Sequence, residues 1–460
     1  MNTPQPPVIA DLLERLPSRA VVTDPDVVAA HARDQAAWVP AGTAAALVRP
    51  RSTGEVITVL ETAARTGVPV VPRGAGSGLS GGANAIDGCL LLSLDGIGEL
   101  VDVDTETRLA RVQPGMLTGD LNRAVAELGL WYPPDPSSRD ISSIGGNVAT
   151  NAGGLCCVKY GVTRDWVAGL EVVLADGRVI RTGSRTRKNV AGYDLTGLFV
   201  GSEGTLGVVT EVTVRLRPPP PAASTAVAFF DSLAEAGRAV TAIMRTVQPS
   251  ILELMDQATI RAVEAIASMD LDQDAAALLI AQADDDTPGQ RAEAIGVVEQ
   301  ACRDAGATWV SSTDDPDEGE QLLAARRLAG TALEHAGPIM REDVCVPVPV
   351  LADYVAGLAD IAERTGVRIA TFGHAGDGNL HPTVVLDDDG DEGRRRAEDA
   401  FDQLIRGALD HGGVITGEHG VGTLKLPWLT DQVGTDVRDV NAAIKHALDP
   451  HGILNPGKAI

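Results

Sequence analysis

The sequence predicts an α+β protein with more than one domain. Short strand-like runs alternate with longer stretches of helical periodicity, and the 460 residues are enough for two or three hydrophobic cores. The clearest strand pair covers 170–175 and 178–182, which Asp176-Gly177 joins as a tight hairpin. Four prolines at 218–221 end a glycine-rich region, and such a run is typical of a stiff domain junction.

The remaining elements follow from the spacing of apolar residues. Helical periodicity predicts helices over 55–65, 119–128, 233–246, 257–267 and 290–305. Thr118 precedes the second of these helices and is its expected N-cap. Short apolar runs predict strands over 68–71, 89–94, 210–216 and 276–281.

Composition excludes several classes of function. The formal net charge of −25 argues against nucleic acid or an anionic membrane surface as the main partner. No run of about 18 apolar residues and no signal peptide occur, so we expect a cytoplasmic protein without a membrane span, with peripheral membrane association left open. The five cysteines suit neither a disulfide framework nor an iron–sulfur cluster, and adjacent Cys156-Cys157 favour packing over redox chemistry. The acidic patch 284–286 is expected to be a solvated loop.

Histidines and carboxylates cluster in two glycine-rich segments. His374 and His381 lie in FGHAGDGNLHP, and Glu418 lies in TGEHGVG. Residues 377–379 are typical of a turn, so the two imidazoles are expected to converge from a strand–turn–strand. Two imidazoles and a carboxylate suit a divalent metal with open coordination positions, with Zn²⁺ as the first choice and Mn²⁺ or Fe²⁺ as alternatives. The competing interpretation is a pair of buried histidines with ordinary hydrogen bonds.

His419 follows the third candidate ligand directly and is the candidate general base. An imidazole titrates near neutral pH, which suits the removal of a proton from a metal-bound hydroxyl group. The combination indicates metal-assisted chemistry on a small, oxygen-bearing molecule.

Three glycine-rich segments occur in the first half of the chain: 71–82, 144–154 and 199–209. In the first, successive small residues after a strand can form an anion-binding nest of N–H groups. Gly76, Gly78 and Gly81 also spell the dinucleotide fingerprint, but turn-forming residues follow where that motif needs a helix. One such segment alone could be an ordinary loop. Three together indicate one extended cofactor lying across several loops.

These segments carry a resemblance to a known family. VPRGAGSGLSGGA, PPDPSS, IGGNVATNAGG, KYGVTRDWV and GSEGTLGVVTEV, in this order, resemble the FAD-binding domain of the vanillyl-alcohol oxidase/p-cresol methylhydroxylase flavoproteins. GHAGDGNLHP, TGEHGVG and LDPHGILNPGK resemble the branch of D-2-hydroxy-acid dehydrogenases, which includes D-lactate dehydrogenase, D-2-hydroxyglutarate dehydrogenase and the glycolate oxidase flavin subunit. The resemblance runs from about residue 44 to 458.

The resemblance implies a fold and domain bounds. A two-subdomain p-cresol methylhydroxylase-type FAD-binding domain would be followed by a C-terminal α+β substrate (cap) domain. We expect an N-terminal helical segment at 1–43, the FAD-binding domain at 44–218, the cap domain at 219–430, and a C-terminal segment at 431–460 that returns to the FAD domain.

The resemblance also implies which residues hold FAD. The pyrophosphate would be held by Arg73, Gly74, Ala75, Gly76, Ser77, Gly78, Gly81 and Gly82. The flavin would lie along Pro134, Ser138, Gly145, Gly146, Asn147, Thr150 and Asn151. The adenine–ribose half would be held by Glu203, Gly204 and Val208, and Asn455 and Lys458 would approach the cofactor. Some relatives attach FAD through a histidine where this chain has Ser77, so noncovalent FAD is expected.

The implied reaction is oxidation of a D-2-hydroxy acid to the 2-oxo acid. The C2 hydride would pass to flavin N5, with His419 as base and an external acceptor, such as a quinone or an electron-transfer flavoprotein, taking the electrons. Arg326 aligns with an arginine that binds the substrate carboxylate, although adjacent Arg327 makes the choice ambiguous and a helix-surface charge is the alternative. Arg341 keeps a dicarboxylate substrate open, and a homodimer is also left open.

Two other functions remain open at this point. One is a metal-independent flavin oxidase of alcohols or sugars, with oxygen as its acceptor. The other is a non-catalytic flavin subunit of a glycolate oxidase complex, which would keep the cofactor loops and lose the metal residues. All four residues of the histidine and carboxylate set are present here, which favours the dehydrogenase.

Overall fold

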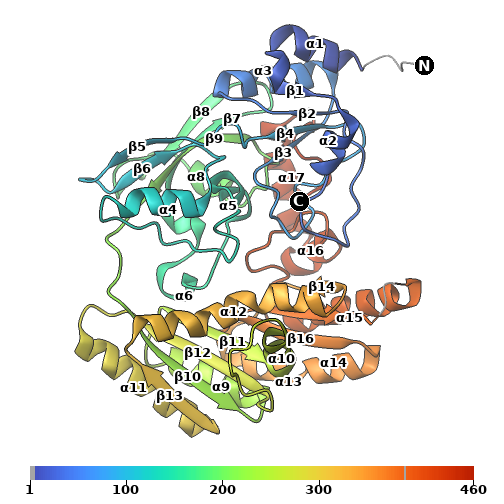
Figure 1. Cartoon of the computed structure of the whole chain (residues 1–460). Coiled ribbons are helices and arrows are strands. Elements are labelled where there is room, and N and C mark those ends of the chain that lie inside the picture. Colours follow the sequence, from blue (N-terminus) through green and yellow to red (C-terminus); the bar gives the residue numbers. More distant parts are fainter. Residues whose placement is uncertain (1–5, 388–389) are drawn as a thin grey trace. The chain divides into compact units, whose positions relative to one another are not determined.

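The computed structural model describes residues 6–387 and 390–460 (Figure 1). The chain divides into two compact units. The glycine-rich unit comprises Met1–Gly153, Gly161–Pro219 and Glu418–Ile460, and the histidine unit comprises Gly154–Tyr160 and Pro220–Gly417. The boundary between Pro219 and Pro220 falls inside the run of four prolines.

The first sheet of the glycine-rich unit has the strand order β1-β2-β4-β3. Its strands are β1 (Val21–Val22), β2 (Ala46–Val48), β3 (Val70–Arg73) and β4 (Leu90–Ser93). β2 and β3 pair with β4 in parallel, and β1 pairs with β2 antiparallel. The strands predicted over 68–71 and 89–94 are therefore confirmed as β3 and β4.

The second sheet is antiparallel, with the order β5-β6-β9-β7-β8. Its strands are β5 (Leu100–Asp104), β6 (Leu109–Val112), β7 (Val167–Val173), β8 (Val179–Gly183) and β9 (Val208–Arg215). The predicted hairpin is confirmed, because β7 pairs directly with β8. Gly177 takes a φ of +86° in the connecting turn, a conformation that glycine adopts without a steric cost.

Helices cover both sheets of this unit. They are α1 (Pro7–Arg15), α2 (Pro25–Ala30), α3 (Thr53–Thr66), α4 (Thr118–Ala126), α5 (Ile144–Thr150), α7 (Thr163–Trp166), α8 (Leu195–Phe199), α16 (Leu426–Val433) and α17 (Thr435–Leu448). α3 confirms the helix predicted over 55–65. It begins where the Ser52 hydroxyl accepts a hydrogen bond from the backbone N–H of Glu55, and it ends at Gly67 with a φ of +68°.

Two expectations about this unit are wrong. Thr118 is not an N-cap; it is the first residue of α4, and Leu117 occupies the cap position. The Thr118 hydroxyl instead accepts a hydrogen bond from the side-chain amide of Asn147 at 2.7 Å. The second glycine-rich segment is not a loop, because residues 144–150 form α5, which the Ser143 hydroxyl caps by accepting from the N–H of Gly146.

The C-terminal segment packs into the first sheet. Leu454 forms a parallel bridge with Val70 of β3, and both side chains are fully buried in the same core. The Asp449 carboxylate accepts hydrogen bonds from the N–H groups of Ile453 and Leu454. Lys445 donates to the carbonyls of Thr205 and Leu454, both at 2.7 Å.

The histidine unit is built on one eight-stranded sheet with the order β13-β10-β12-β11-β16-β17-β14, on which β15 also pairs with β17. The strands are β10 (Ser224–Phe230), β11 (Ile251–Asp256), β12 (Ala277–Ala283), β13 (Trp309–Thr313), β14 (Ile339–Arg341), β15 (Val344–Cys345), β16 (Arg368–His374) and β17 (Asn379–Val385). All of their pairings are antiparallel.

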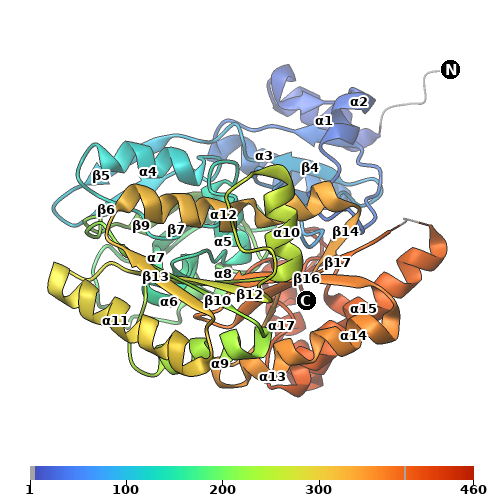
Figure 2. The same ribbon diagram turned by 60° about the horizontal axis from the view of Figure 1, so that its bottom comes forward.

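Helices pack on both faces of this sheet (Figure 2). They are α6 (Cys157–Tyr160), α9 (Leu233–Met244), α10 (Gln257–Ile266), α11 (Pro288–Ala305), α12 (Pro316–Ala336), α13 (Leu351–Ala356), α14 (Leu358–Thr365) and α15 (Asp391–Asp410). α10 packs with α12, whereas α9 packs with α11 and α13. The helices predicted over 233–246, 257–267 and 290–305 are confirmed as α9, α10 and α11.

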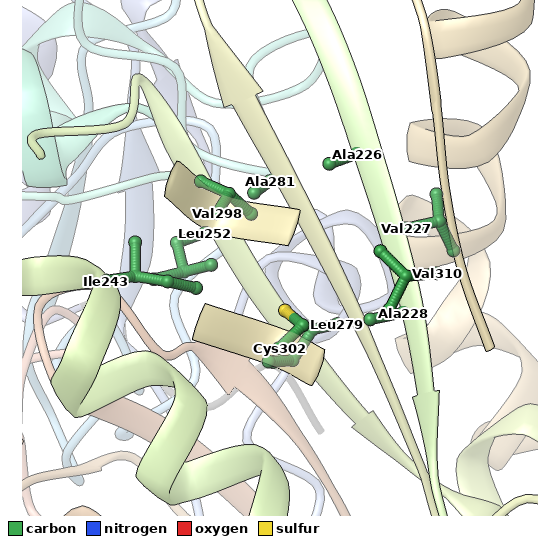
Figure 3. Close-up of a pocket in the computed structure, with 10 residues that line it drawn as sticks. All are labelled: Ala226, Val227, Ala228, Ile243, Leu252, Leu279, Ala281, Val298, Cys302 and Val310. Atoms are coloured by element: carbon green, nitrogen blue, oxygen red, sulfur yellow. The ribbon is translucent and has the colours of Figure 1, made fainter. Parts of the chain in front are cut away.

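A small hollow lies between this sheet and the helices α9 and α11 (Figure 3). Its lining is wholly apolar apart from one thiol: Ala226, Val227, Ala228, Ile243, Leu252, Leu279, Ala281, Val298, Cys302 and Val310. No polar group points into it that could orient a hydroxy acid. The hollow is therefore a gap in the packing of the core.

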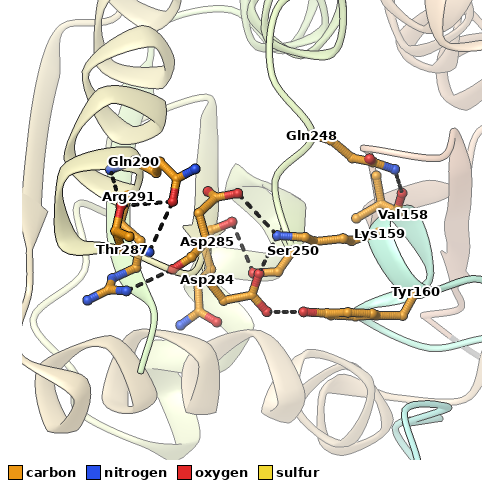
Figure 4. Close-up of polar contacts among 11 residues, drawn as sticks. Val158, Lys159, Tyr160, Gln248, Ser250, Asp284, Asp285, Thr287, Gln290 and Arg291 are labelled. Carbon is orange, nitrogen blue, oxygen red and sulfur yellow. Dashed lines mark hydrogen bonds and ion pairs between the residues drawn. The ribbon is translucent and has the colours of Figure 1, made fainter. Parts of the chain in front are cut away.

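Residues 154–160 belong to the histidine unit although the chain on either side belongs to the glycine-rich unit. Lys159 donates to Asp284 at 2.6 Å, and the Tyr160 hydroxyl donates to the same carboxylate at 2.5 Å (Figure 4). Asp284 is only 6% exposed. The expectation of a solvated loop is therefore wrong for Asp284, because a lysine and a tyrosine replace its water.

The described part of the chain contains no helix long and apolar enough to cross a membrane. None of the five cysteines, all of which lie in the described residues, forms a disulfide. Cys156 is buried and Cys157 half-buried, which agrees with a packing role for this pair.

Candidate functional site

Arg73 at the end of β3 is a buried cation, and it lies next to a run of backbone N–H groups in the loop that follows. The Arg73 side chain lies so close under the loop that a Cβ at Gly76 would come within 1.9 Å of its Nη2. Arg73 is 8% exposed, and its Nη1 has no hydrogen-bond partner among the described residues. Burial lowers the pKa of its guanidinium. The N–H groups of Gly76, Ser77 and Gly78 likewise donate to no residue that the structure describes.

An unpartnered guanidinium and a nest of N–H groups together form a site for a polyanion. A pyrophosphate would satisfy both, so this loop fits the FAD that the sequence motifs imply.

The three glycine-rich segments meet within the glycine-rich unit. The N–H of Ala75 donates to the Ser143 hydroxyl at the start of α5, and a Cβ at Gly74 would collide with that hydroxyl at 2.5 Å. The N–H of Glu203 donates to the carbonyl of Ala149 in α5 at 2.8 Å. Gly204 lies against Pro72 of β3. The close approach of the segments explains why small residues are needed.

Other residues expected along the cofactor are placed around this junction. Gly145 of α5 donates to the carbonyl of Pro114, and Asn151 ends the helix in a left-handed conformation with a φ of 54°. Val208 begins β9 and is buried in the core. The carbonyl of Ser138 accepts from Ser142, next to the cap of α5. The FAD contacts of these residues, and those of Pro134, Gly146 and Thr150, stay predictions.

The C-terminal residues secure the first loop. The Asn455 side-chain amide donates to the carbonyls of Gly82 at 3.0 Å and Glu203 at 2.7 Å. Lys458 donates to the carbonyls of Gly82 and Asn84. Burial lowers the pKa of Lys458 to about 8.

Glu418 and His419 belong to the same unit. The Glu418 carboxylate lies over Gly153, where a Cβ would come within 2.6 Å of Oε2. Nε2 of His419 is 3.8 Å from Oε1 of Glu418, and the side chains are 14% and 16% exposed. Both side chains offer atoms suited to a metal ion.

His374 and His381 lie on adjacent strands of the histidine unit. β16 and β17 pair through a tight turn, which confirms the predicted strand–turn–strand. Gly378 in the turn has a φ of +82°, and a Cβ there would lie 1.9 Å from the carbonyl of Val346. The two imidazole centroids are 5.5 Å apart with perpendicular planes, and each residue is 3% exposed.

Glu253 on β11 orients His374, and sequence reasoning did not identify it. Its Oε1 lies 2.7 Å from Nδ1 of His374, and its Oε2 lies 2.5 Å from Nε of Arg326. Burial is the largest single influence on the Glu253 carboxyl and would raise its pKa, but Arg326 and His374 outweigh it and lower the pKa. An ionised Glu253 holds the proton of His374 on Nδ1, so the lone pair of the ring lies on Nε2.

Asp343 is a second residue that the sequence did not reveal. It is fully buried and accepts hydrogen bonds from Asn379 at 2.8 Å, from the Thr416 hydroxyl at 2.7 Å and from the N–H of Gly417 at 3.0 Å. Its Oδ1 is 3.8 Å from Nδ1 of His381. Asp343 and His381 both offer atoms suited to a metal ion.

The arginines expected to bind substrate have different surroundings. Arg326 is 2% exposed on α12, and its Cζ lies 4.7 Å from the centre of the Phe372 ring. Neighbouring Arg327 instead pairs with Glu320 near the surface. Arg341 donates to the carbonyl of Gly330 at 3.1 Å. The buried position favours Arg326 over Arg327.

One signal in the sequence could have indicated Glu253. It stands in the run Ile251-Leu-Glu-Leu-Met255, and a carboxylate within an apolar strand is seldom buried without a partner. The identity of the partners could not be read from the sequence, since Arg326 and His374 lie far along the chain.

Comparisons with known proteins agree with this geometry. Residues 44–183 match the model of the FAD binding domain, and residues 219–459 match the C-terminal domain of FAD linked oxidases. The glycolate oxidase subunit GlcD of Bacillus subtilis is 44% identical over 416 residues, which cover 90% of this chain and 88% of that protein. The D-lactate dehydrogenase of Anaerostipes hadrus is 32% identical, with 99% and 98% of the two chains covered.

The fold has a counterpart among solved structures. A substrate-bound p-cresol methylhydroxylase superposes with a TM-score of 0.84 at 18% identity, over 98% of this chain and 96% of that one. The expected p-cresol methylhydroxylase-type fold is confirmed. The C-terminal match alone covers more than half of the chain. The chain therefore belongs to the family of FAD-linked oxidases and is an FAD-linked oxidoreductase.

Proposed function

We propose that the protein is an FAD- and divalent-metal-dependent dehydrogenase that oxidises a D-2-hydroxy acid to the 2-oxo acid. Two relatives are named for glycolate and D-lactate, which are both 2-hydroxy acids. The observation that carries the metal-dependent part is the buried hydrogen bond between Glu253 and His374, because it prepares one imidazole nitrogen as a ligand.

FAD supplies the acceptor for the C2 hydride when it is bound. Arg73 and the N–H groups of residues 76–78 would hold its pyrophosphate without a covalent bond, because Ser77 offers no imidazole for attachment. The other two glycine-rich segments approach this loop closely, which suits an extended cofactor lying along all three.

His374, His381 and Glu418 would hold the divalent metal, with Zn²⁺, Mn²⁺ or Fe²⁺ as candidates. A metal ion held by these residues would supply Lewis acidity, which lowers the pKa of the substrate hydroxyl group. Glu418 follows Gly417 directly in the chain, and Asp343 fixes the backbone of Gly417 through its N–H. This anchor limits the positions that the Glu418 backbone can take.

His419 would accept the proton of the C2 hydroxyl on its unprotonated ring nitrogen, a contribution of about 10²–10⁴-fold in rate for general base catalysis. Arg326 would bind the substrate carboxylate. Its Nη2 is buried without a hydrogen-bond partner among the described residues, which is expected of a group that binds an anionic ligand. Arg341 would serve a second carboxylate if the substrate is a dicarboxylate.

The electrons would leave the flavin for an external acceptor, such as a quinone or an electron-transfer flavoprotein. The cysteine spacing does not suit an iron–sulfur cluster, so the chain offers no such store beyond the flavin.

The experiment is anaerobic reduction of the bound flavin by D- and L-2-hydroxy acids, with and without a chelator. We expect one D-acid among lactate, glycolate, 2-hydroxyglutarate and longer acids to bleach the visible flavin bands, and we expect the chelator to abolish bleaching. Bleaching that ignores the chelator, with peroxide formed in air, would favour an alcohol oxidase. A flavin that no acid reduces would favour a non-catalytic subunit.

Two variants separate the roles of metal and base. Glu418→Ala should lose metal and activity while it keeps FAD, and His419→Ala should keep both FAD and metal but lose turnover. Glu211→Gln is the control, because this glutamate lies on β9 and pairs with Arg111. Normal turnover in either test variant would overturn the assignment of that residue.

A further inference from the structure

The residues after His419 form a loop that fits closely onto two side chains. Gly420 and Gly422 have φ values of +85° and +51°, which disfavour any other residue. A Cβ at Gly420 would lie 2.9 Å from Oε1 of Glu203, and a Cβ at Gly422 would lie 2.1 Å from the carbonyl of Ser80. The loop therefore has almost no freedom to shift towards these residues.

Glu203 binds this loop through both carboxylate oxygens. Oε1 accepts from the N–H of Val421 and Oε2 accepts from the N–H of Gly422, each at 2.8 Å. The backbone of Glu203 is itself fixed, because its N–H donates to Ala149 and its carbonyl accepts from Asn455. The carboxylate therefore acts as a rigid two-point acceptor.

Ser80 holds the same loop from the first glycine-rich segment. Its hydroxyl donates to the carbonyl of His419 at 3.0 Å. Its own carbonyl accepts from the N–H groups of Thr423 at 3.0 Å and Leu424 at 3.1 Å. The His419 backbone is thus held directly by Ser80 and, through the next residues, by Glu203.

We propose that Glu203 and Ser80 are positioning residues for His419. They fix residues 419–422 so that the imidazole stands where it can take the hydroxyl proton. The proposal rests on the proposed role of His419 as base. A displacement of about 1 Å in a reacting group can cost about 10²-fold in rate, so loosening this loop should slow proton removal even though neither residue touches substrate.

The sharpest variant is Glu203→Gln. Glutamine keeps the size and one acceptor, but its NH₂ group then faces a backbone N–H, donor against donor. Ser80→Ala is a milder variant that removes only the hydroxyl bond to His419. Ser202→Ala and Glu211→Gln are matched controls from the same unit.

For each holoenzyme the experiment measures three quantities. They are the flavin content, the melting temperature and the rate of anaerobic flavin reduction at saturating hydroxy acid. The adenine–ribose contact expected of Glu203 stays a prediction, but both of its carboxylate oxygens are already engaged by the loop. Glu203→Gln should therefore retain flavin and reduce it about 10²-fold more slowly per bound flavin, with a smaller change in KM. Ser80→Ala should slow reduction less, and both controls should match the native protein. A role limited to FAD binding would lower the flavin content and leave the rate per flavin unchanged, which would overturn the proposal.

A double variant tests whether Glu203 acts through the base. If it does, Glu203→Gln combined with His419→Asn should be no slower than His419→Asn alone, because the positioned group is already absent. Rate losses that multiply would assign Glu203 an independent role and overturn the proposal. A His419→Asn variant with the native rate would instead refute the base assignment, so the two failures can be distinguished.

Discussion

Glu203 and Glu253 are both buried glutamates, yet their environments shift their pKa values in opposite directions. Glu203 faces backbone N–H groups, and burial outweighs these bonds and the charge of Lys458, which raises its pKa to about 7. Glu253 lies against Arg326 and His374, which overcome burial and lower its pKa. Backbone N–H donors and the charge of Lys458 therefore do not keep the buried Glu203 carboxyl strongly acidic, whereas the guanidinium and imidazole beside Glu253 keep that carboxyl acidic.

The largest expected effect follows from removal of the Glu253 carboxylate. Glu253→Ala leaves Arg326 buried without its counter-charge, so we expect a loss of about 3–5 kcal/mol in the free energy of unfolding. Urea denaturation measures this change in the free energy of unfolding. Glu320→Ala is the matched control, since it removes the partner of near-surface Arg327 and should cost no more than about 1 kcal/mol. Equal losses in the two variants would contradict the interpretation.

The next effect is the pH dependence of stability that the Glu203 carboxyl causes. Below about pH 4.5 the carboxyl is protonated in both the folded and unfolded states, and it imposes no penalty. Between about 4.5 and 7 the folded protein keeps a proton that the unfolded chain has lost, so stability falls as pH rises. The full penalty, on the order of 3 kcal/mol, is reached above about pH 7.

Glu203→Gln removes this titration. The stability of the native protein relative to the variant should therefore decline from pH 4.5 to 7. Lys458 titrates at about 8, outside this window, and Asp34 is common to both proteins. Melting temperatures across the pH range provide the measurement, and a difference that does not change with pH would show that Glu203 is ionised throughout.

A third effect concerns metal binding. Glu253→Gln can still contact Nδ1 of His374 but no longer supplies a negative charge, so we expect metal affinity to fall about 10–100-fold. Metal content after dialysis against graded chelator measures the change, with FAD absorbance as the internal control. Glu203→Gln should retain its metal, and a metal loss in that variant equal to the loss in Glu253→Gln would remove the distinction between the two residues.

The smallest expected effect lies in the loop that Glu203 holds. Gly420→Ala places a side chain in left-handed backbone at a cost of about 1–2 kcal/mol, and its Cβ crowds Glu203. Gly67→Ala is a useful control, because Gly67 is also left-handed, with a φ of +68°, but nothing lies within 4 Å of its Cβ. A loss of stability at Gly67 equal to or larger than the loss at Gly420 would show that the contact with Glu203 is loose.

Sequence patterns predicted elements that depend on local physics. The hairpin at Asp176-Gly177 and the helices α3, α9, α10 and α11 follow from turn chemistry and apolar spacing, both of which are local. The errors arose where distant residues decide. Thr118 was expected to cap a helix, but Asn147 uses its hydroxyl instead. α5 was missed because glycine, asparagine and threonine are poor helix formers, and Ser143 starts it nevertheless.

The residues of the candidate site show the same difference between local and long-range information. Motifs identified residues such as His374, whose chemistry is visible in the residue type. They did not identify Glu253 or Asp343, because a carboxylate acquires its role only from the groups that folding brings to it. Arg326 shows both cases, since its charge was visible in the sequence while its pairing with Glu253 was not.

The glycine-rich unit is made of segments that are far apart in the sequence, and this affects the order in which the two units can fold during synthesis. Val70 of β3 forms a bridge with Leu454, and the carbonyl of Gly82 accepts from Asn455 and Lys458, so the glycine-rich unit lacks these contacts until residues 454–458 leave the ribosome. The histidine unit has all of its residues by Gly417. The part translated later should therefore become native first, while the N-terminal strands wait for their C-terminal partners. A nascent chain stalled before residue 449 would expose an unfinished cofactor loop to proteases and chaperones.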